Sequence, residues 1–242
     1  MIGFETGVLC LWDLPSKRGE QRYSHQHRVT SVAWHFEVRQ FVCSCSDGSL
    51  VTWNVRTTSG KPVSTVWPHK TKEVAVCDEI HRVVWVVSRD GDQYLIFSGG
   101  LPQDITGTTP SMTIMQGKNT TVLEMDYCVL DFILVTDTPY QSDYQNPESI
   151  IVLLSNDLMA IDCRSTGFPT YENPYAMDFQ DSAVTCCEYV VDCPPDLIPA
   201  LYKVGAKGRK SERWSNREWP ISGGVPSGTE SVQHVELLGK IS

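Results

Sequence analysis

The chain has 242 residues, 41% of them hydrophobic and 10% aromatic, which is the composition of a folded globular protein rather than of a disordered segment. Its net charge of −9 argues against general binding to nucleic acid. No apolar run approaches the roughly 18 residues that cross a bilayer. The nine cysteines lack a disulfide-type spacing and include no C-x-x-C pair, so we expect reduced thiols in a reducing compartment and no metal or redox centre.

The first strands of the chain carry an internal repeat. A glycine, a leucine, a tryptophan and an acidic or amide residue at positions 7, 9, 12 and 13 return 41 residues later, as Gly48, Leu50, Trp53 and Asn54. A repeat of about 40–45 residues in which a Trp-Asp pair ends a strand is typical of a propeller blade. The sequence therefore predicts an all-β propeller, with a hairpin from another all-β fold as the alternative.

The second copy of the repeat contains three short strand-like runs, the first two being Val29–Trp34 and Gln40–Cys45. An Asp47-Gly48 turn precedes the third run, because glycine supplies the positive φ of a tight hairpin at no steric cost. The first run has apolar residues on both faces, with Val32 and Trp34 on one and Val29 and Ala33 on the other. We therefore expect this strand to be buried on both sides, as in a blade covered by its two neighbours.

The remaining blades are expected in chain order. Residues 1–14 are predicted to end one blade and residues 21–66 to form the best-defined one, with a fourth strand near 62–66. The later strands are predicted at residues 81–87, 94–98, 111–115, 121–124, 129–135, 149–154 and 158–162, with a weak strand after Phe168. A fifth unit begins at 183–190, and no further Trp-Asp strand follows. The prediction is a β-propeller fragment with about three complete four-stranded blades and partial blades at both ends.

Three segments follow from this pattern. Residues 1–202 are predicted to be propeller blades, residues 203–231 a basic, Gly/Ser-rich insertion loop, and residues 232–242 the truncated start of a further strand. The first residues lie inside a repeat, so we expect a truncated chain or an incomplete gene model. An open ring leaves bare strand edges, so we expect the isolated chain to self-associate.

The second repeat resembles the WD-repeat family in detail. That family links a His before the first strand, a hydroxyl on the second, an Asp in the turn and a Trp on the third. Here His25 follows Ser24 where the family has Gly-His, and Asp47 lies six residues before Trp53. The hydroxyl position falls on Cys43, a departure that weakens the relay. The expected structural positions are His25, Asp47, Trp53, Trp12 and Asp13, with Asp47 accepting hydrogen bonds from the turn backbone and from His25.

Catalytic motifs are missing from the sequence. It contains neither a phosphate-binding G-x-x-x-x-G-K-[ST] loop nor a G-x-S-x-G nucleophile elbow. His25 and His27 form an H-x-H pair without nearby carboxylates, which favours a blade cap or a solvated loop over a metal site. The prediction is a protein that is not an enzyme and has no cofactor, metal or small-molecule substrate.

Several long runs resemble the tomosyn and lethal giant larvae family of WD-repeat proteins. They are Y-L-I-F-S-G-G-L-P at 94–102, G-K-N-T-T-V-L-E-M-D-Y at 117–127, the run at 186–202 and R-E-W-P-I-S-G-G at 217–224. The likeness is closer to tomosyn at Y-E-N-P-Y (171–175) and at 186–202. It implies a cytoplasmic scaffold, peripherally associated with the plasma membrane, that regulates SNARE-dependent exocytosis through syntaxin. The alternative is a cell-polarity scaffold of the lethal giant larvae type that binds myosin II and a polarity kinase.

This resemblance covers part of the family's N-terminal propeller. The SNARE-like heptad helix of tomosyn has no counterpart in the sequence, so direct entry into a SNARE bundle is not implied. Four tyrosines in the loops, at positions 140, 144, 171 and 175, are further candidates for partner contacts because aromatic side chains are enriched at interfaces; packing within the exposed loops is the alternative.

The segment 203–218 carries six basic residues against two acidic ones, a net charge of +4 on an acidic chain. We predict that it contacts anionic lipid headgroups or an acidic SNARE surface through Lys207, Arg209, Lys210, Arg213 and Trp214; a solvated insertion is the alternative. Replacing the four basic residues with Ser should remove the salt-sensitive part of binding to anionic liposomes and to syntaxin, measured at two salt concentrations. Binding that keeps its salt dependence would leave the solvated insertion as the explanation.

Overall fold

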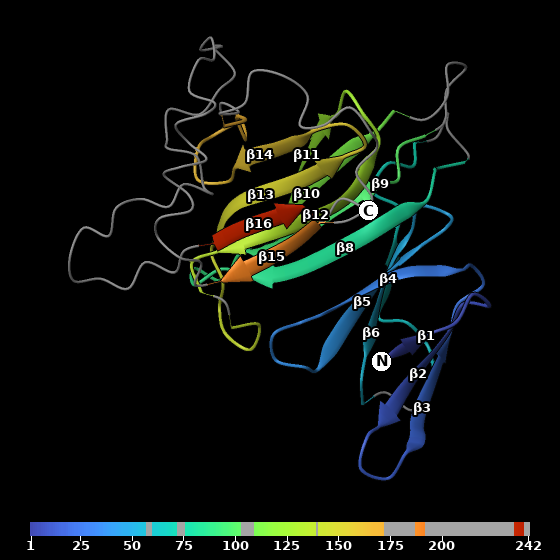
Figure 1. The fold of residues 1–242 in the computed structure, drawn as a ribbon. Coiled ribbons are helices and arrows are strands. Elements are labelled where there is room, and N and C mark those ends of the chain that lie inside the picture. Colours follow the sequence, from blue (N-terminus) through green and yellow to red (C-terminus); the bar gives the residue numbers. More distant parts are fainter. Residues whose placement is uncertain are drawn as a thin grey trace, which may run out of the picture. The chain divides into compact units, whose positions relative to one another are not determined.

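The structure is a computed structural model that describes residues 1–56, 60–71, 76–102, 109–138 and 140–171, together with the backbone of strands 187–191 and 235–239. These residues form antiparallel strands and turns, and no helix occurs among them, which confirms the all-β prediction (Figure 1). It follows that the described part of the chain offers no helix with the length and hydropathy to span a bilayer. The chain divides into two compact units, residues 1–126 with 138–146, and residues 127–137 with 147–242.

The first unit contains three sheets, each in simple chain order. The first sheet consists of β1 (Ile2–Gly3), β2 (Val8–Asp13) and β3 (Arg18–Ser24). The second consists of β4 (Val29–Trp34), β5 (Gln40–Cys45), β6 (Leu50–Asn54) and β7 (Ser64–Val66). The third consists of β8 (Ile80–Val87), β9 (Gln93–Gly99), β10 (Ser111–Gln116) and β11 (Asn119–Glu124). The strands predicted for the second and third blades are confirmed.

The boundary between the first two blades differs from the prediction. Residues 21–24 belong to β3, which pairs with β2, so the second blade begins at β4 and not at residue 21. Although β3 pairs with β2, its residue Tyr23 is 1% exposed and lies edge-on to Phe41 and Trp53 of the second sheet, with ring centroids 5.0 and 5.5 Å apart. Its hydroxyl donates to the Val55 carbonyl at 3.0 Å. A strand on the first sheet thus supplies an aromatic side chain to the packing between the two sheets.

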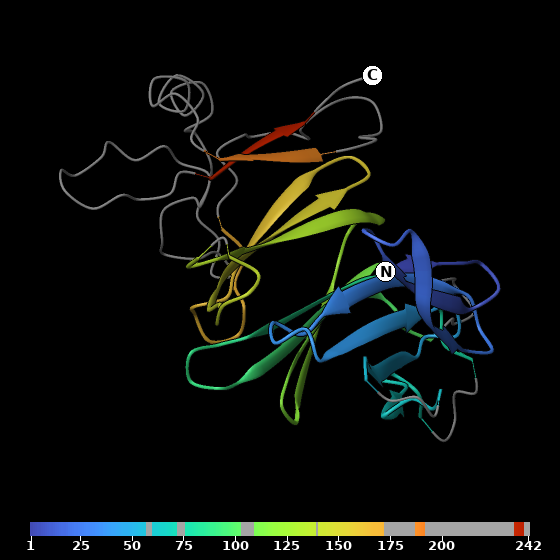
Figure 2. The same ribbon diagram turned by 90° about the horizontal axis from the view of Figure 1, so that it is seen from below.

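The second sheet is covered on both faces, and β5 shows this most clearly. Phe41, Cys43 and Cys45 point into a cluster shared with Leu9 and Tyr23 of the first sheet. Val42, which alternates with them, packs with residues of the third sheet such as Ile80, Val83 and Phe97. In Figure 2 the three sheets, coloured dark blue, light blue and teal to green, follow one another in this order. The blade is therefore enclosed by its neighbours, as the propeller prediction requires.

β4 differs from its prediction in two respects. All six of its residues are half-buried rather than buried, because it is an edge strand that pairs only with β5 in its sheet. A bulge between Val29 and Ser31 also places Val29 on the same side as Val32 and Trp34. Consecutive Thr30 and Ser31 both face β8 as a result: the Thr30 hydroxyl donates to the Ile80 carbonyl, and the Ser31 hydroxyl accepts from the Val83 amide at 3.4 Å.

The second unit begins with a three-stranded sheet of β12 (Val129–Thr136), β13 (Pro147–Leu154) and β14 (Leu158–Asp162). The weak strand expected after Phe168 is a single bridge between Ile161 and Thr170. β15 (Cys187–Val191) pairs antiparallel with β16 (Val235–Gly239), close to the strands expected at 183–190 and near 232–242. The basic insertion predicted between them lies outside the described residues, and the three predicted segment boundaries stay predictions.

Candidate interaction site

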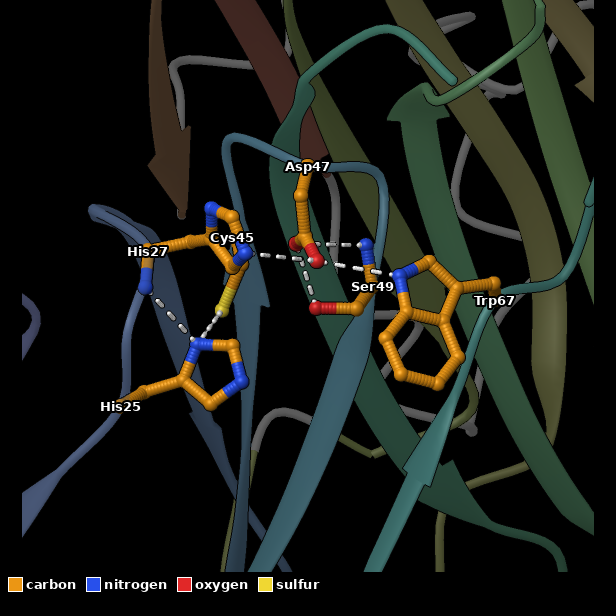
Figure 3. A network of polar contacts seen from close by, with 6 residues as sticks. All are labelled: His25, His27, Cys45, Asp47, Ser49 and Trp67. Carbon is orange, nitrogen blue, oxygen red and sulfur yellow. Dashed lines mark hydrogen bonds and ion pairs between the residues drawn. The ribbon is translucent and has the colours of Figure 1, made fainter. Parts of the chain in front are cut away.

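A polar cluster surrounds the turn between β5 and β6. It combines the turn residues Asp47 and Ser49, Cys45 at the end of β5, the two histidines of the connection from β3 to β4, and Trp67, which follows β7 (Figure 3). Three loops that are separated in sequence therefore meet at one turn, which is the kind of place where a blade presents side chains to a partner.

Asp47 lies at the centre of this cluster and its side chain is 16% exposed. It accepts hydrogen bonds from the Ser49 hydroxyl at 2.6 Å, the Ser49 amide at 3.2 Å and the Trp67 indole at 3.0 Å. His27 Nε2 lies 3.6 Å from Asp47 Oδ2, the oxygen that also accepts from the Trp67 indole. Burial by itself raises the pKa of Asp47, but the bonds from Ser49 and Trp67 and the charge of His27 lower that pKa overall.

The predicted bond from His25 to Asp47 is wrong, and His27 lies next to the carboxylate instead. His25 Nδ1 accepts from the His27 amide at 3.3 Å and lies 3.6 Å from Cys45 Sγ. The path of the chain explains the exchange: the His25 amide donates to the Gly7 carbonyl at 2.9 Å, which turns the His25 ring toward β5. His27, two residues further along the chain, then lies beside Asp47 in the β5–β6 turn. The bond predicted from the turn backbone to Asp47 is confirmed by the Ser49 amide.

Trp53 is a core residue in this structure. It is 1% exposed, and its indole nitrogen has no hydrogen-bond partner within the described ranges. The β5 residue beside His25 is Cys45 and not Cys43, and both cysteines are fully buried in the core. Burial raises the pKa of Cys45 to about 11 and raises that of Cys43 still further. Both thiols stay protonated near neutral pH, so they fill space and do not act as nucleophiles.

The predicted pair Trp12 and Asp13 ends β2, as expected, but Trp12 is 42% exposed. Asp13 accepts from the Ser16 amide at 2.9 Å, which closes the turn that leads to β3. Asn54 Oδ1 likewise accepts a hydrogen bond from the Arg56 amide at 2.9 Å. These two positions are thus equivalent turn caps, and their role is structural.

Two residues with a role in these turns were not predicted from the sequence, a third turn cap and the indole of the Asp47 cluster. Asp162 ends β14 and accepts from the Arg164 amide at 2.9 Å and the Ser165 hydroxyl at 2.7 Å, which repeats the role of Asp13 and Asn54. The sequence signal for this cap was Asp162 itself, which follows an apolar residue and lies five residues after the Asp157 turn. Trp67 is the other: it is 38% exposed, and Lys70 Nζ lies 5.1 Å from its ring centroid. Its only signal was a Trp-Pro dipeptide after the predicted fourth strand.

Two further expectations concern contacts and metals. Lys207, Arg209, Lys210, Arg213 and Trp214 lie outside the described residues, so their predicted lipid or partner contact stays a prediction. Within the ranges that the structure describes, no group of three His, Cys, Asp or Glu side chains converges on a position that could hold a metal ion. The cluster around Asp47 combines hydrogen-bonded polar groups with the half-exposed indole of Trp67.

The first prediction from this geometry compares Asp47 with Asp92. Asp47→Ala should lower the free energy of unfolding by about 1.5–3 kcal/mol, because a shielded carboxylate loses several donors and leaves them unpaired. Asp92 accepts one exposed bond, from Gln116 Nε2 at 2.9 Å, so Asp92→Ala should cost about 0.5 kcal/mol or less. Urea unfolding of the two variants measures the difference, and equal shifts would mean that the Asp47 bonds do not stabilise the turn.

The same comparison has a defined pH dependence. The pKa of Asp47 is lowered in the folded state, so its stabilisation is present above the unfolded pKa of about 3.9 and is lost as the pH falls through the folded pKa. The gap between wild type and Asp47→Ala should therefore be constant near neutral pH and shrink below about pH 4. A gap that is unchanged at acid pH would argue that the carboxylate charge is irrelevant.

The sequence is similar to a family model and to several known proteins. The family model LLGL: LLGL2 matches residues 66–169. The chain is 26% identical over 238 residues to rat "Lethal(2) giant larvae protein homolog 1", covering 98% of this chain and 23% of that protein. It is 28% identical over 239 residues to zebrafish "LLGL scribble cell polarity complex component 2", again covering 98% of this chain and 23% of the relative. The chain thus spans about a quarter of the length of these relatives.

A solved structure supports the fold. The WD40 domain of Toxoplasma gondii coronin superposes with a TM-score of 0.52 at 14% sequence identity, over 77% of this chain and 44% of that one. This likeness concerns the fold alone and confirms the prediction of a WD-repeat propeller fragment. The sequence matches do not show the predicted closeness to tomosyn. They show a similarity to lethal giant larvae proteins.

Proposed function

We propose that this chain is part of a cell-polarity scaffold of the lethal giant larvae type, which binds proteins and catalyses no reaction. The observation that carries the proposal is the similarity along 98% of the chain to proteins whose names are "Lethal(2) giant larvae protein homolog 1" and "LLGL scribble cell polarity complex component 2". The proposed partners are myosin II and a polarity kinase, and the proposed location is the cytoplasmic side of the plasma membrane.

The geometry of the first unit supports a scaffold. Its sheets are held by two apolar clusters on either side of β5, so the turns at their ends are carried on a rigid support. The turn at Asp47 presents Trp67, a half-exposed indole fixed by a bond to Asp47 and by Lys70 above its ring. Tryptophan is among the residues that contribute most binding energy at interfaces, so Trp67 is a proposed partner contact.

Regulation of SNARE-dependent exocytosis through syntaxin is the second candidate. It derives from the resemblance to tomosyn at 171–175 and 186–202, where Tyr171 is the one residue whose side chain the structure describes, and it is 7% exposed. The matches to lethal giant larvae homologues favour the polarity function over this one. The basic segment with Lys207, Arg209, Lys210 and Arg213 is a proposed contact with anionic lipid under either function.

Binding of purified partners separates the two functions. The immobilised chain is titrated with the myosin II tail, with a polarity kinase domain and with the cytosolic part of syntaxin, at the same salt concentration. We expect saturable binding of myosin II or the kinase and none of syntaxin. Saturable binding of syntaxin alone would contradict the polarity proposal and select the exocytosis function. Circular dichroism of the immobilisation stock confirms that the chain is folded in the assay.

A further inference from the structure

A row of aromatic rings crosses the first unit from β8 to the segment 140–146. Trp85 on β8 meets the ring of His35 at 4.8 Å between centroids, His35 meets Phe36 at 4.7 Å, and Phe36 meets Tyr144 at 4.6 Å. His35 and Phe36 begin the turn between β4 and β5. Burial lowers the pKa of His35, so its ring is neutral at physiological pH and behaves as part of the apolar row. The row fixes the position of Tyr144 against the β4–β5 turn.

Backbone bonds hold the segment 140–146 in the same place. The Gln145 amide donates to the Val87 carbonyl at 2.8 Å, and the Arg89 amide donates to Asn146 Oδ1 at 3.1 Å. The Gln145 side chain donates to the Thr138 carbonyl at 3.0 Å, and the Asp143 amide donates to the Tyr140 carbonyl at 3.2 Å. Tyr140 therefore lies one tight turn away from Tyr144 on a fixed segment.

Large side chains are nevertheless exposed here. Tyr140 is 65% exposed, Tyr144 is 42% exposed, and Val38 in the neighbouring turn is 60% exposed. Val38 also has a φ of +56°, which is unfavourable for a β-branched residue. Because the Val38 side chain is largely exposed, its burial contributes little free energy to offset this backbone strain. Lys17 and Phe168 have the same conformation in other turns, with φ values of +53° and +51°, so the positive φ belongs to the turn geometry; here it leaves the Val38 side chain at the surface.

The charges around these residues are mainly negative. The β4–β5 turn, the β8–β9 turn and the segment 140–146 contain four exposed carboxylates and two exposed guanidinium groups; they are Glu37, Asp90, Asp92 and Asp143, and Arg39 and Arg89. A tyrosine face attracts a cation, most often the guanidinium of arginine, and a carboxylate beside it can bond the same group. The combination favours a cationic partner with a planar head group and an apolar stem.

We propose that Val38, Tyr140 and Tyr144 form a docking surface for an arginine-bearing segment of a partner protein. The arginine stacks on a tyrosine ring within reach of Glu37 and Asp143, and a neighbouring apolar side chain of the partner packs on Val38. The inference deepens the scaffold function proposed above and rests on it, because it supplies one of the surfaces through which such a scaffold binds.

The test uses the full chain and three labelled ten-residue peptides, in which leucine alternates with arginine, lysine or glutamate. Fluorescence anisotropy measures the binding of each peptide to wild type and to the variants Tyr140→Ser and Val38→Asn. The matched control is Val122→Asn, because Val122 is an exposed valine (39%) on β11, away from the proposed surface. We expect the arginine peptide to bind more tightly than the lysine peptide and the glutamate peptide not to bind. Tyr140→Ser and Val38→Asn should each weaken the arginine peptide by about threefold or more, whereas Val122→Asn should not.

Val38→Asn gives an independent readout, because asparagine tolerates a positive φ. Its melting temperature should be equal to or above that of wild type while its peptide affinity falls, which excludes unfolding as the cause. Equal affinity for arginine and lysine peptides, or unchanged affinity in both variants, would overturn the proposal. So would self-association of wild type that Val38→Asn abolishes, since the occupant would then be a second copy. No polarity protein enters this assay, so its outcome is independent of the binding experiment with myosin II and syntaxin.

Discussion

The close approach of one blade's turn glycine to the entry of the next blade is the constraint on which the first unit depends. Gly48 has a φ of +75°, and a Cβ at this position would lie 2.6 Å from Cys77 Cβ and 2.8 Å from the Asp78 carbonyl oxygen. Gly7, its counterpart in the first repeat, has a φ of +79°, and a Cβ there would meet the carbonyl oxygens of His25 and His27 at 2.3 and 2.6 Å. The glycine repeat therefore sets how near adjacent blades can come, and both apolar faces of β5 are covered because they come this near.

The polar cluster at Asp47 follows from the same contact. The chain between β3 and β4 runs over Gly7 and turns His25 toward Cys45, so that His27 comes to the neighbouring turn. Ser49 and Trp67 then complete the set of donors around Asp47. A network of this kind stabilises the turn and at the same time holds an indole at the surface, so the stability of the turn and the exposure of the proposed contact residue Trp67 have one physical origin.

Local patterns made much of the fold predictable. The tight turn predicted at Gly48 and the strands predicted at 29–34 and 40–45 depend on residues that are close in sequence, and these predictions are confirmed. Other features depend on contacts between distant segments. β3 pairs with β2 although its sequence is largely polar, and its one buried residue, Tyr23, packs on Phe41 and Trp53 of the next sheet. His27 rather than His25 lies beside Asp47 because the His25 amide bonds to the Gly7 carbonyl. Trp67 belongs to the cluster because its indole bonds to Asp47. Neither contact can be predicted from the spacing of residues in the sequence.

The measurement that tests the blade contact most directly compares Gly48→Ala with Gly91→Ala by chemical unfolding. Gly91 also has a positive φ, +87°, but a Cβ there has no atom within 4 Å, so this variant carries only the backbone cost of about 1–2 kcal/mol. Gly48→Ala carries the same cost and adds overlap with Cys77 and Asp78 of the next blade's entry, so it should lose about 1–3 kcal/mol more. Equal losses in the two variants would contradict the account, because the Gly48 turn would then have room that close packing of the blades does not allow.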